Sequence, residues 1–145
     1  MAKIDIRTAL LQGVINANTG GLPVKWPNLP TQNANLTAPV EPTNQPWIRA
    51  NILSMDSEVW TLGATGKNRV FGALQLTVFV PAATGDRNAF TQAGSLESVF
   101  KTGAVLSYNG DHVRILSADY KPGPEENQWY SLVISVNYES YLARG

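Results

Sequence analysis

Cysteine is absent from the 145 residues, and histidine occurs once. The chain therefore has no disulfide, no thiolate metal site and no cysteine nucleophile. A histidine-based metal centre needs several clustered ligands, and a serine hydrolase needs a histidine beside an acid and an exposed serine. His112 follows the pair Asn109-Gly110, a two-residue hairpin signal, so we expect an exposed hairpin residue. We predict no catalytic residue, no metal site and no cofactor.

Charge is also scarce. Acidic and basic residues make up 15% of the chain and balance to a formal net charge of zero, whereas about 25% is usual in soluble domains. Without a basic excess, electrostatic binding of nucleic acid is not expected. No apolar run approaches the roughly 20 residues of a membrane span, and charges interrupt the first seven residues, so we expect neither a membrane segment nor a signal peptide.

Two patterns that could carry chemistry are weak. Gly66-Lys67 resembles the end of a phosphate-binding loop, but Thr61 and Asn68 stand where that motif has glycine and Ser or Thr. Eleven acids leave open a hydrolase whose fold assembles a carboxylate pair. Most of these acids lie at expected turns or caps, where solvation accounts for them.

What the chain does contain is apolar and aromatic: hydrophobic residues make up 43%, with four Trp, five Tyr and four Phe. Low charge with many aromatics predicts aromatic surface left over after the core is filled, and such surface marks interfaces. The alternative is a well-filled core with ordinary scattered exposure.

Two segments have helical periodicity. Residues 3–17 carry a broad apolar stripe, formed by Ile6, Leu10, Leu11, Val14 and Ile15. Residues 87–101 carry a narrow stripe behind a possible N-cap at Asp86, formed by Ala89, Ala93, Leu96 and Phe100. Between the helices, residues 19–46 hold six prolines and are expected to form an extended loop without regular structure. That loop either lies on its own domain or reaches a neighbour.

The remaining segments alternate with period two, as strands do. The clearest is 69–80, where Val70, Leu74, Leu76 and Val78 share one face. The expected strands are 47–54, 57–62, 69–80, 104–108, 111–119 and 128–141. We therefore predict a single α+β domain over 1–145, with a mostly antiparallel sheet, two helices packed on one face and the long Pro-rich loop.

Four segments in this order resemble the tail terminator, or tail completion, proteins of long-tailed bacteriophages. They are the N-terminal helix leading into the proline-rich loop, residues 46–53, residues 69–81 with Thr84-Gly85 and the following helix, and residues 129–136. The resemblance implies a structural virion subunit. It would form a ring with copies of itself, usually of six, at the head-proximal end of the tail tube.

The same resemblance implies the partners. Such a ring stops growth of the tail tube protein and presents a surface to the head connector or stopper protein, while DNA passes through its lumen without sequence-specific binding. The protein would be assembled in the bacterial host cytoplasm and reside in the neck of the virion tail.

The sequence offers its own candidates for contacts between subunits or with partners, because aromatic and arginine side chains dominate interfaces. They are Trp26, Trp47, Arg49, Trp60, Lys67 and Arg69. Lys67 and Arg69 flank a polar hairpin tip that could dock on an acidic neighbour. The alternative function is a small ligand- or peptide-binding module, with an apolar pocket lined by Trp60, Phe79 and Trp129.

Overall fold

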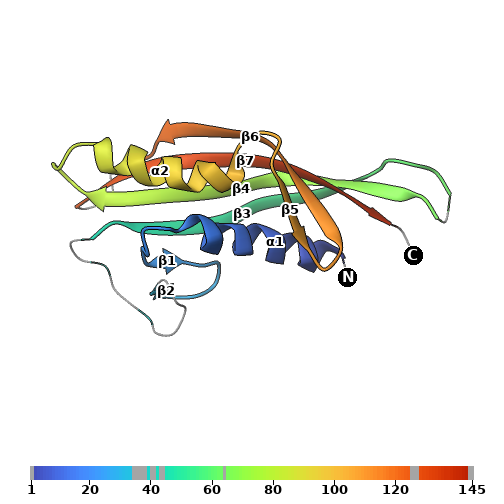
Figure 1. The fold of residues 1–145 in the computed structure, drawn as a ribbon, viewed down its shortest axis with the longest axis horizontal. Coiled ribbons are helices and arrows are strands. Elements are labelled where there is room, and N and C mark those ends of the chain that lie inside the picture. Colours follow the sequence, from blue (N-terminus) through green and yellow to red (C-terminus); the bar gives the residue numbers. More distant parts are fainter. Residues whose placement is uncertain are drawn as a thin grey trace.

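Seven strands form one sheet in the order β2-β1-β3-β4-β7-β6-β5, and two helices cover one of its faces (Figure 1). The computed structural model describes residues 2–33, 39, 42, 45–63, 65–124 and 128–143. The elements in chain order are α1 Ala2–Ala17, β1 Val24–Lys25, β2 Thr31–Gln32, β3 Trp47–Val59, β4 Lys67–Pro81, α2 Arg87–Phe100, β5 Val105–Tyr108, β6 Asp111–Pro122 and β7 Trp129–Ala143. The predicted α+β class is confirmed. Among the described strands, every pairing is antiparallel except that of β1 with β3.

The core lies between the helices and the sheet. Val70, Leu74, Leu76, Val78 and Val80 of β4 are buried, as their alternation predicts. The neighbouring strands place matching apolar residues beside them, for example Leu132 opposite Val78 and Ile134 opposite Leu76 on β7.

Helix α2 is buried along the predicted stripe Ala89, Ala93, Leu96 and Phe100. Asp86 stands at the N-cap but its side chain makes no capping hydrogen bond. In α1, Ile6, Leu10 and Val14 are fully buried, whereas Ile4 is 60% exposed and Ile15 only partly buried. The broad stripe expected for α1 is therefore confirmed, because Leu11 is buried as well and Ile15 packs against the core, while Ile4 lies outside the stripe. Neither helix of the described chain is long and apolar enough to span a membrane.

The predicted break at Met55-Asp56 is wrong. Residues 47–59 form one continuous strand, β3, which pairs with β4 along its length. The register shifts between Ile52 and Ser54, a β-bulge that places one extra residue in β3. The bulge reverses which residues face the core, so alternation read from the sequence looks like two strands with a joint.

The prediction that residues 19–46 lack regular structure is also wrong in part. Val24–Lys25 and Thr31–Gln32 pair with each other, and Val24–Lys25 continues the sheet next to β3. Pro23 supports this arrangement, since its carbonyl accepts a hydrogen bond from the Ile48 N–H at 2.9 Å. Prolines at 23 and 27 flank the strand but leave its own donors intact. The rest of the predicted loop, residues 34–38, 40–41 and 43–44, lies outside the described residues.

The outer half of the β3–β4 hairpin projects beyond the helices (Figure 1). The end of β7 accompanies it, as Lys67 pairs with Ala143 and Arg69 with Tyr141. We call residues 53–63, 65–72 and 139–143 the arm. Among the described residues, β1 adjoins β3 only at Ile48 and Arg49, so β3 is an edge strand along the arm.

Candidate interaction surfaces

The base of the arm is fixed by a close approach of three strands. Gly72 of β4 lies so near the Ser54 carbonyl in the bulge that a Cβ at position 72 would overlap it. The hydroxyl of Tyr138 on β7 donates a hydrogen bond to this carbonyl at 2.7 Å, and Tyr138 is fully buried. Burial, together with the charge of Asp56, raises the pKa of Tyr138 to about 12. Only glycine permits this contact, which joins the arm to the body.

Inside the arm, Arg69 is bound by two carboxylates. Its Nε donates to Glu139 on β7 at 2.9 Å, and a terminal nitrogen contacts Glu58 on β3 at 3.3 Å. The guanidinium also lies 4.6 Å from the centre of the Phe71 ring. The hydrogen bond to Glu139 raises the pKa of Arg69 above its ordinary value, so this side chain keeps its charge. Arg69 therefore links all three strands of the arm.

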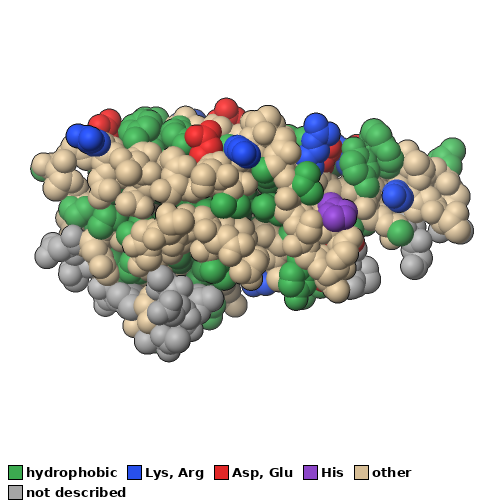
Figure 2. Space-filling view, in the orientation of Figure 1, with side chains coloured by type: hydrophobic (Ala, Val, Ile, Leu, Met, Phe, Trp, Pro, Cys, Tyr) green, Lys and Arg blue, Asp and Glu red, His purple; other side chains and the backbone are tan. Residues whose placement is uncertain are grey.

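The end of the arm presents apolar side chains to solvent (Figure 2). Trp60 is 56% exposed and Leu62 is 90% exposed. The Trp60 ring rests against Tyr141 of β7 with 5.1 Å between ring centres. Lys67 is exposed beside them, and its main chain pairs with that of Trp60. Exposed aromatic and aliphatic groups on one projection are typical of a surface that contacts another protein.

At the opposite end of the sheet, on the face away from the helices, aromatic rings cluster around Phe79. Trp47 stacks on Phe79 with 4.1 Å between ring centres, and Trp129 meets Trp47 edge-on at 6.0 Å. The Arg49 guanidinium lies 4.9 Å from the centre of the Phe79 ring. Phe79 is fully buried although it lies on the face without helices. The cluster forms a second small core there.

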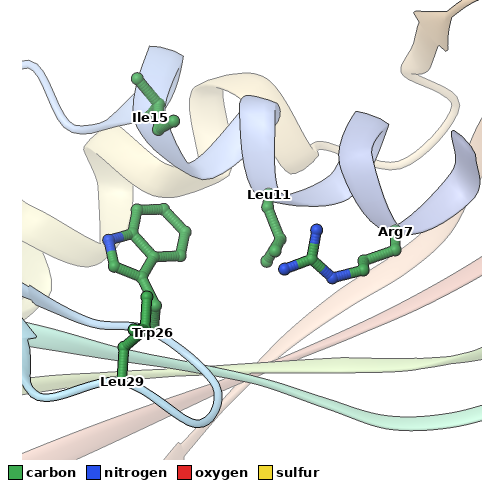
Figure 3. Close-up of a pocket in the computed structure, with 5 residues that line it drawn as sticks. All are labelled: Arg7, Leu11, Ile15, Trp26 and Leu29. Atoms are coloured by element: carbon green, nitrogen blue, oxygen red, sulfur yellow. The ribbon is translucent and has the colours of Figure 1, made fainter. Parts of the chain in front are cut away.

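A groove opens between α1 and the turn that follows β1 (Figure 3). Arg7, Leu11 and Ile15 come from one side of α1, and Trp26 and Leu29 face them from the turn. We call it the Trp26 groove; its volume is about 170 Å³. Trp26 is buried, and its Nε1 has no hydrogen-bond partner among the described residues. Asn28 turns the chain with a positive φ of 58°, which directs Leu29 back towards the helix.

Few other groups gather in ways that suggest chemistry. Burial and a hydrogen bond with Asp5 raise the pKa of Asp111, and burial and a hydrogen bond to Glu97 raise the pKa of Tyr120 to about 12. His112 is exposed, as predicted, and its Nδ1 lies 2.7 Å from the Ser107 hydroxyl. Within the described ranges, no three His, Asp or Glu side chains come together as a metal site would need.

The structure distributes the candidate contact residues over three places. Trp60, Lys67 and Arg69 belong to the arm, Trp47 and Arg49 to the aromatic cluster, and Trp26 to the groove. The predicted pocket of Trp60, Phe79 and Trp129 does not form. Phe79 and Trp129 both contact Trp47, whereas Trp60 is 13 residues farther along the chain, on the arm.

Sequence reasoning missed Leu62 and Arg7. Leu62 follows Trp60 at two-residue spacing in a polar tip, a signal of paired apolar groups outside any core. Arg7 lies one turn before Leu11, at the edge of the apolar stripe of α1. Leu29 was visible in the sequence as an apolar residue that could hold the proline-rich segment against a surface, and it faces α1.

Comparison with known proteins shows a match to one protein family. The model of a family described as "Phage tail terminator protein" matches residues 5–138. No curated protein matches the chain. Among solved structures, one chain whose name states no function is 23% identical, with a TM-score of 0.71 over 97% of this chain and 96% of its own. At that identity the likeness shows the fold alone.

Proposed function

Because this chain belongs to the phage tail terminator protein family, we propose that it forms a ring at the head-proximal end of a phage tail tube. Membership of the family gives it a structural role in the tail, in association with other tail and head proteins. In the proposal, the ring contains six copies, stops growth of the tube and joins the tail to the head connector. DNA passes through the lumen, and the ring is added in the host cytoplasm.

The observation that carries the proposal is the extent of the family match. Residues 5–138 cover most of both helices, of the core and of the sheet, together with the part of the arm that β3 and β4 form. Two physical features support an assembling subunit. The arm carries exposed Trp60 and Leu62 away from the body, and the net charge of zero suits a wall that DNA passes without being held.

A deletion in the encoding phage tests the role. Without the protein, tail tubes are expected to vary in length and to lack heads, because nothing ends their growth or joins them to the connector. Electron micrographs of lysates, with and without the protein supplied in trans, measure tube length and head attachment. Tails of uniform length with heads attached in the deletion lysate would refute the proposal.

The ring itself is measured separately. Light scattering after size exclusion is expected to give a mass near six times 15.7 kDa, with rings visible in micrographs. If the purified protein is monomeric, the measurement is repeated with preformed tubes, where rings are expected on one end only. Tubes that continue to elongate in its presence would contradict tube termination.

A further inference from the structure

The Trp26 groove has the size and lining of a site for an aromatic ring. Its volume of about 170 Å³ is comparable to a cavity of about 150 Å³ that binds benzene. Leu11, Ile15, Trp26 and Leu29 make it apolar, and Leu29 is 49% exposed at its rim. An exposed apolar groove of this kind is typical of a binding site.

One end of the groove is basic. Arg7 is exposed, and it makes no ion pair or hydrogen bond with the described residues; Lys3 is exposed one turn earlier in α1. The nearby acid Asp5 is buried and hydrogen-bonded to Asp111. In Figure 3 the guanidinium of Arg7 lies along the groove beside Leu11. A ligand that fits this groove is therefore apolar at one end and acidic at the other.

The arm presents that combination on one face. Asp56 and Glu58 are two residues apart on β3, so their side chains project from the same side of the strand. Trp60, one residue beyond β3, joins them on this face, because its ring rests against Tyr141, which pairs with Arg69 opposite Glu58. The same face also carries the bases Lys67 and Arg69, but Arg69 is held by Glu58 and Glu139. Asp56 is exposed and has no ion pair within the described part of the chain. Trp60 and Asp56 are thus an available ring and an available carboxylate.

The distance between Asp56 and Trp60 on the arm matches the distance between the basic and apolar ends of the groove. Four strand residues from Asp56 to Trp60 span about 13 Å at a rise of about 3.3 Å per residue. Eight helical residues from Arg7 to Ile15 span about 12 Å at a rise of about 1.5 Å per residue. With the Trp60 ring in the apolar end of the groove, Asp56 therefore lies within reach of Arg7.

The partner must be another molecule. The arm extends away from the body, whereas the groove lies along α1, so a chain cannot place its own arm in its own groove (Figure 1). A contact between two different surfaces of identical subunits runs head to tail, and it closes a ring when the rotation permits. Acidic residues along the edge of β3 discourage strand-to-strand pairing, which favours docking by the face of the arm.

We propose that the arm of one copy docks in the Trp26 groove of the next, with Trp60 in the apolar end and Asp56 paired with Arg7. This docking proposal rests on the proposed function in one respect, namely that copies of the chain assemble with one another. It identifies the surfaces that the copies use.

The absence of cysteine makes a direct test possible. Leu62→Cys and Leu29→Cys alter exposed side chains, so both are expected to leave the fold intact. Under mild oxidation the double variant is expected to give a ladder of covalent multimers beyond the dimer, because each copy bonds to the next. The matched control pairs Leu62→Cys with Phe90→Cys, a 43% exposed residue on α2, and is expected to give dimers at most.

Outcomes separate this contact from the proposed function. If rings or capped tubes form but no ladder of covalent multimers appears, the proposed contact is overturned and the groove has another occupant. The proposed terminator role would be unaffected by that result. Equal ladders from both pairs would also overturn it. Absence of rings, of capped tubes and of a ladder would remove contact and function together.

A charge exchange tests the polar end. Arg7→Glu and Asp56→Lys are each expected to weaken assembly about tenfold, since each places like charges together at the contact. The double variant is expected to recover to within about threefold of the native chain, measured by light scattering over a concentration series. Additive losses in the double variant would show that the two residues do not meet.

Discussion

At the residue scale, Gly72 is the position that leaves least room for a larger side chain. A Cβ there would meet the Ser54 carbonyl, which is backbone and cannot turn aside. Gly72→Ala is expected to cost roughly 1–3 kcal/mol in the free energy of unfolding, the usual range for overpacking. Gly94→Ala is the control, because a Cβ at that position in α2 meets nothing within 4 Å. It is expected to gain about 1 kcal/mol. Urea unfolding measures both, and similar effects of the two changes would contradict the account of the arm's base.

Tyr138 gives the same junction a pH dependence. Its pKa rises from the ordinary 10.0 to about 12 in the fold, so the folded state holds the proton more tightly than the unfolded state. This contribution to stability is complete below pH 10 and is lost as the pH rises through about 12. The loss amounts to about 1.4 kcal/mol per pH unit within the window. Tyr138→Phe is expected to show a shallower alkaline decline of unfolding free energy; an unchanged slope would contradict the prediction.

At the element scale, the arm depends on Arg69, which connects Glu58 of β3 with Glu139 of β7. Arg69→Met is expected to increase amide hydrogen exchange in β7 residues 139–143, because Glu139 loses its nearest cation. Lys67→Met, on the same strand, is the matched control and is expected to leave exchange unchanged. If both variants exchange alike, the ion pairs do not hold the arm together. Whether either residue also contacts a partner stays a prediction.

The local periodicity of apolar residues predicted most of the helices and strands correctly, and there is a physical reason for this. Helix α2 and strands β4 and β7 present one apolar face each, so their periodicity is visible in the chain. The broad stripe of α1 likewise faces the core, whereas β3 contains a bulge. The bulge shifts the alternation of buried and exposed residues within one strand, which is why the sequence predicted two strands where the structure has β3 alone.

At the scale of the whole molecule, folding and assembly use separate apolar residues. Leu76 is fully buried in the core, whereas Leu62 is 90% exposed at the end of the arm. Leu76→Ser is expected to cost more than about 3 kcal/mol, as it leaves a cavity and buries a hydroxyl. Leu62→Ser is expected to change stability by less than about 0.5 kcal/mol while weakening assembly. Thermal unfolding and light scattering measure the two effects, and equal loss of stability in both variants would show that the arm belongs to the core.

The sequence by itself determined the α+β class, the buried faces of α2, β4 and β7, and the resemblance to tail terminators, because these depend on near neighbours and their period. Tertiary structure alone decided that Arg69 meets Glu139, 70 residues away, and that Trp26 faces α1 across a groove. Such contacts follow from strand order and register, which many distant residues fix together. The same reason left the available pair Arg7 and Asp56 invisible until the fold showed which charges were already bound.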